Sequence, residues 1–243
     1  MNQDPRSNLT ELSRNSYPGR GIVIGLDETG KYFVQVYWIM GRKENSRNRF
    51  FGYDSKTGRV FTEAADPAKM KDPSLVIYDA MLEKDGTFAV SNGDQTRSFL
   101  GRTFQGGLDD WAYEPDVPNF TPRISAACYL ESNRTGSKAI AEIGITRKSA
   151  WGTSSDRHIY SFEELGEGIG LCVTTYTGDG NPLPAFHGEP YPVFLRGSIE
   201  DIANNFWISV LDMENRVALA VKLIDRQSGR STVQIINKYE KVS

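Results

Sequence analysis

The chain has 243 residues, with 28 Lys and Arg against 31 Asp and Glu, a formal net charge of −3 and a pI of about 5.6. This length fits one large domain or two small ones, and it buries a substantial core without disulfides or metals. The slightly acidic balance excludes a protein whose whole surface binds nucleic acid. No apolar run approaches 18 residues, and the polar N-terminus lacks the apolar segment of a signal peptide, so we expect neither a membrane span nor export.

Residues 1–16 are polar, and we expect them to form a loose N-terminal arm ahead of a single domain over residues 17–243. Strand patterns dominate that domain. The sequence predicts strands over residues 21–25, 31–40, 50–54, 59–64, 74–83, 87–92, 124–132, 138–147, 169–178, 216–225 and 231–240. Asp85-Gly86, between two of these runs, is the strongest short hairpin signal.

Helical spacing of apolar residues occurs in two segments only, 96–111 and 198–211. The second opens with Ser198 and Asp201 at the spacing of a helix cap. Residues 148–158 and 179–192 have loop composition. Many strands with two helices predict an α+β protein of stacked sheets with helices outside.

Only two cysteines occur, Cys128 and Cys172, and each lies inside an apolar run. This placement predicts free buried thiols rather than a disulfide. Because free thiols suit a reducing compartment, we expect a cytoplasmic protein.

A cluster of cations follows the predicted strand 31–40. The segment "GRKENSRNRFF", residues 41–51, contains Arg42, Lys43, Arg47 and Arg49. One interpretation is a solvated charged loop, which is what charge runs usually are. The other is an anion clamp at a strand end, because the guanidinium fork suits phosphate.

Four more polar stretches lie at predicted strand ends: 17–21 ("YPGRG"), 91–93 ("SNG"), 111–124 ("WAYEPDVPNFTPRI") and 174–178 ("TTYTG"). Each also has a purely structural interpretation, as a turn, a surface ion pair or a core tyrosine. The two histidines, His158 and His187, are far apart in sequence and have no metal ligands at suitable spacing. We therefore expect no metal and no other cofactor.

The order of these stretches along the chain resembles the archaeal-type IMP cyclohydrolases, which close the purine ring in the last step of inosine monophosphate synthesis. The likeness runs from about residue 17 to about residue 225. It implies a four-layer αββα sandwich like that of the N-terminal-nucleophile hydrolases, without their autoprocessing. The family pattern also includes a tyrosine ahead of "SNG", which corresponds to Tyr78 here.

The resemblance implies an enzyme that converts FAICAR to IMP by dehydrative ring closure. Formally, it is a hydrolase of cyclic amide C–N bonds running in the ring-closing direction. The catalytic residues implied are Glu114, Tyr78 and Arg20. The residues implied in binding the purine ribonucleotide are Arg42, Ser46, Asn48, Arg49, Asn92, Asp116, Arg123 and Tyr176.

Two other functions fit the same sequence. The first is an amide hydrolase of the N-terminal-nucleophile type, which needs Cys, Ser or Thr at a mature N-terminus, here Ser7 or Ser16 after processing. The second is a non-catalytic purine nucleotide-binding protein on the same fold. Sheet proteins of this kind often self-associate, so a homo-oligomer is a further expectation.

Overall fold

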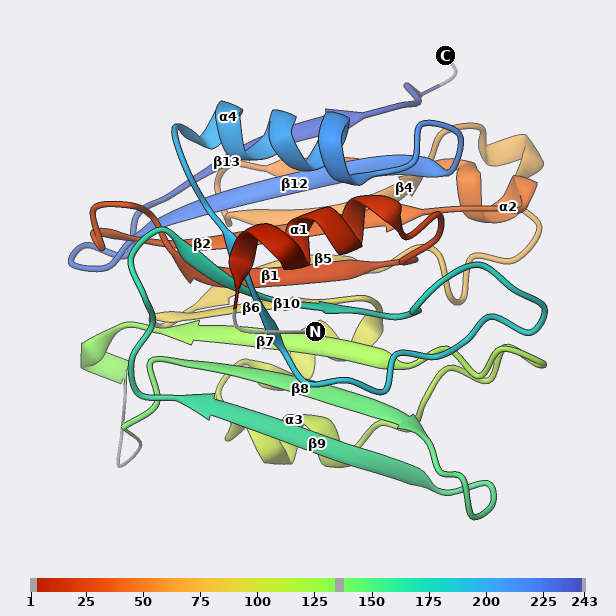
Figure 1. Ribbon diagram of the computed structural model, residues 1–243, viewed down its shortest axis with the longest axis horizontal. Coiled ribbons are helices and arrows are strands. Elements are labelled where there is room, and N and C mark those ends of the chain that lie inside the picture. The colour runs from red at the N-terminus through yellow and green to blue at the C-terminus, as the bar shows by residue number, and fades with distance from the viewer. Residues whose placement is uncertain (1–3, 134–137, 242–243) are drawn as a thin grey trace.

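The computed structural model describes residues 4–133 and 138–241, and within them thirteen strands form two antiparallel sheets (Figure 1). The six-stranded sheet has the order β11 (Tyr191–Phe194), β10 (Ile169–Thr174), β1 (Gly21–Leu26), β2 (Tyr32–Met40), β12 (Arg216–Asp225) and β13 (Ser231–Asn237). The seven-stranded sheet has the order β3 (Arg49–Asp54), β4 (Arg59–Ala64), β5 (Asp79–Lys84), β6 (Thr87–Ser91), β7 (Arg123–Tyr129), β8 (Ala141–Lys148) and β9 (Ser155–Phe162).

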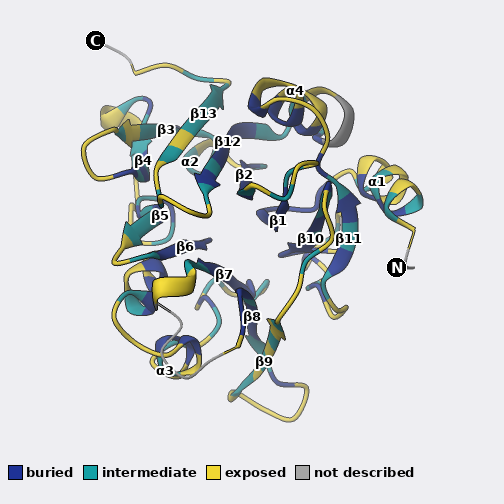
Figure 2. Cartoon of the chain, turned by 90° about the vertical axis from the view of Figure 1, so that its left-hand side faces the viewer, coloured by how far each residue is buried: buried dark blue, intermediate teal, exposed yellow. Residues whose placement is uncertain are grey.

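Few helices accompany the sheets. The helical elements are α1 (Pro5–Arg14), α2 (Glu44–Arg47), η1 (Pro67–Lys69), η2 (Asp94–Phe99), α3 (Phe104–Asp109), η3 (Glu131–Asn133), α4 (Ile199–Asn204) and the π-helical η4 (Asn205–Val210). Elements α1 and α4 pack on the six-stranded sheet, and α3 with η2 packs on the seven-stranded one (Figure 2). The sequence prediction of stacked sheets with helices outside describes this mixed α and β arrangement.

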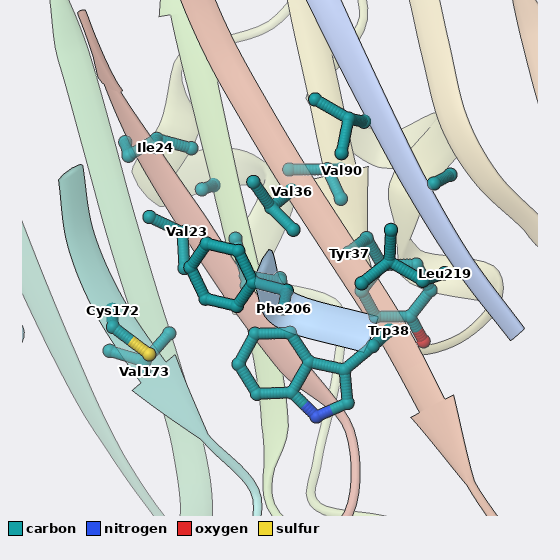
Figure 3. Packing of buried hydrophobic residues seen from close by; sticks show 14 of the residues in the cluster. Val23, Ile24, Val36, Tyr37, Trp38, Val90, Cys172, Val173, Phe206 and Leu219 are labelled. Carbon is teal, nitrogen blue, oxygen red and sulfur yellow. The ribbon is translucent and has the colours of Figure 1, made fainter. Parts of the chain in front are cut away.

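The main core lies between the two sheets, where the Tyr37 ring of β2 packs against the Phe51 ring of β3 with centroids 5.6 Å apart, and Figure 3 shows part of the buried cluster to which both belong. On the opposite face of the six-stranded sheet, the Trp38 ring stacks on Phe206, with centroids 5.9 Å apart. Strands β1 and β2 are therefore buried on both faces. This double burial explains why they read as continuous apolar runs rather than as alternating ones.

The hairpin predicted at Asp85-Gly86 is present between β5 and β6. Both residues have positive φ, 48° for Asp85 and 76° for Gly86, as a type I′ turn requires. The predicted cap of α4 is also present, since Ser198 and Asp201 each bond the other's backbone N–H. Cys128 and Cys172 are free and buried, which confirms the prediction of free thiols.

Residues 1–16 do not form a loose arm where the structure describes them. Asp4 caps α1, and the helix packs against β11. Leu12 joins the main core with 1% of its surface exposed, and Asn8 donates to the carbonyl of Pro192 at 2.9 Å. The polar composition concealed this helix because only one narrow stripe of it is apolar.

Several predicted boundaries are wrong. Residues 155–158, expected in a loop, begin β9, and residues 191–192 begin β11. Both strands lie at sheet edges, where partly exposed strands take polar residues and so resemble loops in sequence. Residues 74–78, expected in a strand, precede β5. The predicted helix over 96–111 is divided into η2 and α3 around Gly101, whose φ is 74°.

No helix within the two described ranges is long and apolar enough to cross a membrane.

Candidate active site

A cleft with a volume of about 210 Å³ collects most of the polar stretches at one end of the sheets. Its walls come from the residues before β1, from the end of β2 with α2, from the loop 114–121 and from the segment after β10. The lining residues are Tyr17, Gly19, Arg20, Met40, Arg42, Lys43, Ser46, Arg49, Leu75, Val76, Glu114, Asp116, Val117, Asn119, Thr121, Tyr176 and Leu183. Seven residues of the sequence-predicted site are among them.

A buried ion pair between Arg20 and Glu114 lies in this cleft. The two guanidinium NH groups of Arg20 donate to the two carboxylate oxygens of Glu114 at 2.9 and 2.8 Å. Only 10% and 3% of the respective side-chain surfaces are exposed. Burial raises the pKa of Glu114 above its ordinary value, while the positive charge of Arg20 opposes that shift. The carboxylate is thus a desolvated group held in one orientation.

The backbone around Gly19 fixes the position of Arg20. Gly19 has a φ of 72°, and a Cβ there would lie 2.3 Å from Thr175 Oγ1 and 2.5 Å from the Tyr176 ring. Thr175 Oγ1 in turn accepts the Arg20 N–H at 3.0 Å. Only glycine permits this approach, so the "Y-P-G-R" stretch places Arg20 against the segment that follows β10.

Asn92 and Arg123 lie beneath the cleft and do not line it. Asn92 Nδ2 donates to the carbonyl of Pro122 at 2.9 Å and reaches Glu114 Oε1 at 3.5 Å. Arg123 donates to Gln95 Oε1 at 2.8 Å and to the carbonyl of Ala112 at 3.0 Å. These bonds support Glu114 and its loop from below.

Gln95 joins these two residues and was missed by the sequence analysis. It is fully buried, and its Nε2 donates to Asn92 Oδ1 at 2.9 Å while its Oε1 accepts from Arg123. A glutamine three residues after Asn92 in a polar stretch gave no signal, because its partner Arg123 lies 28 positions away in the chain.

Tyr78 also lies below the cleft, with 5% of its surface exposed. Its hydroxyl lies 2.7 Å from the hydroxyl of Tyr37, a fully buried residue in the middle of β2. Sequence reasoning missed Tyr37 because it reads as one more aromatic residue of an apolar strand. Burial raises the pKa of Tyr37 well above the ordinary tyrosine value, so it remains a neutral hydroxyl group.

The cationic cluster 41–49 does not continue the strand. Gly41 is followed by the single helical turn α2, and a Cβ on Gly41 would lie 2.7 Å from the Ser46 backbone. The turn directs Arg42, Lys43, Ser46 and Arg49 toward the cleft. Arg42 forms an ion pair with Asp179, and its guanidinium lies 5.1 Å from the centroid of the Tyr17 ring.

Arg49 is the most buried cation of the cluster, with 2% of its surface exposed. Its donors reach the carbonyls of Ser46, Val76 and Met40 at 3.0, 3.5 and 3.4 Å. No carboxylate within residues 4–133 and 138–241 forms an ion pair with it at 4 Å or less. Arg49 therefore brings a buried positive charge to the cleft wall.

Asn48 and Arg47 face away from the cleft. Asn48 forms a reciprocal pair of hydrogen bonds with the backbone of Asp66, both at 2.7 Å, and Arg47 donates to the carbonyl of Gly41 at 2.8 Å. Both line a separate surface hollow behind α2. Asn48 thus has a structural role here, because the chain at the end of α2 turns it to the opposite side from Ser46 and Arg49.

Asp116 and Tyr176 form the remaining wall of the cleft. Asp116 accepts the backbone N–H of Thr121 at 2.6 Å, and the hydroxyls of Thr121 and Tyr176 are hydrogen-bonded to each other. The Tyr176 ring stacks on Tyr17, with centroids 5.9 Å apart. No group of three or more His, Cys, Asp or Glu side chains in the described part of the chain could hold a metal ion.

The fold and the cleft define a class: an α+β protein of two stacked antiparallel sheets with a cationic cleft around a buried Arg–Glu pair. The chain belongs to the IMP cyclohydrolase-like protein family, whose model matches residues 17–228. This match begins at Tyr17, the first residue of the cleft, and spans every residue that lines it. Among curated proteins, none matches the chain.

Proposed function

We propose that this protein is an IMP cyclohydrolase, which closes FAICAR to IMP with loss of water. The observation that carries the proposal is the combination, in one cleft, of a cationic wall and a buried carboxylate held by an arginine. Membership of the IMP cyclohydrolase-like family supports a purine nucleotide as the ligand. The two stacked sheets with outer helices are compatible with the αββα sandwich of the N-terminal-nucleophile hydrolases. We include this four-layer architecture in the proposal.

The 5′-phosphate binds at the wall formed by Arg42 and Arg49. Arg42 is 30% exposed at the mouth, where its partner is the half-exposed Asp179. Such an exposed ion pair contributes little, so a phosphate dianion displaces the carboxylate at small cost. Arg49 adds a positive charge that is already desolvated, and charge-assisted bonds to phosphate are strong under these conditions.

The reacting end of the substrate lies at Glu114. The carboxamide nitrogen of FAICAR attacks the formyl carbon, and the ionised Glu114 accepts the proton that this nitrogen loses. Glu114 returns this proton to the tetrahedral oxygen. The resulting hydroxyl leaves as water with a second proton, which the formamide nitrogen gives up as it forms its double bond to the former formyl carbon. Arg20 orients the carboxylate, and Tyr78 supports the developing oxyanion as a hydrogen-bond donor. The reaction needs no oxidant. Because the carboxamide and the formamide belong to one substrate molecule, holding them in contact supplies much of the rate enhancement.

The test is an absorbance assay of the purified full-length protein with synthetic FAICAR, combined with calorimetric titration of IMP. We expect turnover to IMP and saturable IMP binding. Binding of IMP without turnover would identify a nucleotide-binding protein that lacks the activity, and absence of both would contradict the proposal.

The amide hydrolase alternative is tested by the intact mass of the same sample. That chemistry needs a nucleophile at a processed N-terminus, before Ser7 or Ser16. Cleavage before Ser7 would cut α1 near its start. Cleavage before Ser16 would remove α1 together with its core residue Leu12. If the active sample has the mass of the full-length chain, its N-terminus is unprocessed and the amide hydrolase alternative is excluded.

A further inference from the structure

Three side chains form a continuous hydrogen-bonded chain along the wall of the cleft. Thr121 Oγ1 lies 2.5 Å from Asp116 Oδ2, and the Thr121 backbone N–H donates to Asp116 Oδ1 at 2.6 Å. The Tyr176 hydroxyl bonds to the same Thr121 Oγ1. Thr121 is fully buried and Tyr176 is 5% exposed, so the bond between their two hydroxyls is sheltered from bulk water.

The hydrogen atoms in this chain have only one consistent arrangement. The Thr121 hydroxyl donates to Asp116 Oδ2, and a hydroxyl has only one hydrogen, so Thr121 has none left for Tyr176. The Tyr176 hydroxyl must then give its own hydrogen to Thr121. Burial raises the pKa of Tyr176 to about 12, so this hydrogen is retained at neutral pH. The phenol oxygen therefore presents only a lone pair to the cleft.

Tyr176 lies between the two functional ends of the cleft. On one side its ring stacks on Tyr17, beneath Arg42 of the phosphate wall. On the other side, Thr175 directly before it accepts the backbone N–H of Arg20, whose guanidinium holds Glu114. In a 5′-nucleotide the ribose joins the phosphate to the base, and the ribose hydroxyls are hydrogen-bond donors.

We infer that Thr121 is a positioning residue that makes the Tyr176 hydroxyl a hydrogen-bond acceptor for a ribose hydroxyl of the bound nucleotide. This inference rests on the proposed function, because it takes a purine ribonucleotide as the ligand. In this inference Asp116 acts indirectly. Its carboxylate sets the direction of the hydrogen bonds from Tyr176 through Thr121 and does not itself bind the sugar.

The experiment is a calorimetric titration of IMP, 2′-deoxy-IMP and 3′-deoxy-IMP into wild type, Tyr176→Phe, Thr121→Val and Thr121→Ser. In wild type we expect one of the two deoxynucleotides to bind about 3- to 10-fold more weakly than IMP, the range for a single hydrogen bond. That penalty should disappear in Tyr176→Phe and fall in Thr121→Val, where Tyr176 is no longer held as an acceptor. Thr121→Ser retains the hydroxyl and should retain the penalty.

Thermal unfolding of each variant shows that it is folded before the titration is interpreted, and Tyr176→Phe tests the inference in the case in which the valine variant does not fold. If wild type binds IMP and neither deoxynucleotide is weaker, or if the penalty persists unchanged in Tyr176→Phe, the inference is wrong while the proposed function stands. If wild type does not bind IMP at all, both are wrong.

Discussion

At the scale of single residues, the chemistry depends on a few side chains that are buried where water would otherwise compete. Glu114 is nearly inaccessible to solvent. Both of its carboxylate oxygens accept hydrogen bonds from Arg20, and Asn92 approaches one of them. Removing one member of a buried charged pair leaves the other without a partner, at a cost of about 3–5 kcal/mol. Variants at this pair therefore need conservative replacements if activity and folding are to be separated.

Glu114→Gln keeps the shape of the side chain and removes its ability to take a proton. We expect kcat to fall about 10²-fold or more, in the usual range for general acid–base groups. Steady-state kinetics with FAICAR measures this, with Tyr78→Phe as the comparison, for which we expect a smaller loss. Full activity in Glu114→Gln would show that Glu114 only positions the substrate.

The pH dependence of kcat/KM should reflect the burial of Glu114. Because burial raises its pKa, the carboxylate takes up a proton at a higher pH than the ordinary value of about 4.3. If the ionised form is the base, activity is lost as the pH falls through this raised pKa. The acidic limb should therefore have a midpoint above about 4.3 and be absent in Glu114→Gln. A limb that persists in that variant belongs to another group.

At the scale of elements, the short turn α2 decides which cations reach the cleft. After Gly41 the chain leaves the strand and makes the single helical turn α2, which ends at Asn48 before β3 begins at Arg49. Arg42, Ser46 and Arg49 line the cleft, whereas Arg47 and Asn48 line the hollow behind α2. A solvated charged loop would show no such division.

Arg42→Ala should weaken IMP binding about 10- to 150-fold, since a charge-assisted bond contributes roughly 1.5–3 kcal/mol. Binding of inosine, which lacks the phosphate, should barely change. The matched control is Arg47→Ala, from the same turn but facing the other hollow, for which we expect IMP affinity close to wild type. Calorimetric titration compares the three proteins. Equal IMP affinity in Arg42→Ala and wild type would contradict the phosphate wall.

Helix α1 is the other element whose role is set by packing. Leu12→Ala removes a core side chain, and we expect the free energy of unfolding to fall by about 2–5 kcal/mol. Ser13→Ala, on the exposed side of the same helix, should change it by no more than about 0.5 kcal/mol. Chemical denaturation of both variants measures the difference. A loss below 1 kcal/mol in Leu12→Ala would mean that α1 contributes little to the fold.

At the scale of the whole molecule, two sheets bring distant polar segments to one end while the interior between them stays apolar. In the part of the chain that the structure describes, thirteen antiparallel strands pair their backbone groups in two sheets, and the strand ends supply the site. Because no cluster of three metal-ligating side chains occurs in the described ranges, we expect the FAICAR rate to be unchanged after extended treatment with EDTA. A large loss that one divalent ion restores would show that the reaction uses a metal.

Local spacing in the sequence was enough to predict eleven of the strands described, the hairpin at Asp85-Gly86, the free thiols and the order of polar stretches, but not the edge strands β9 and β11. Tertiary structure decided which of those residues meet. Arg20 and Glu114 are 94 positions apart, and no local pattern encodes their contact. It also decided that Asn48 faces away, that Tyr37 and Gln95 join the site, and that residues 5–14 form a packed helix. The physical reason is that burial and side-chain direction depend on what packs against an element, whereas tight turns and runs of strand-forming residues are set by residues close together in the sequence.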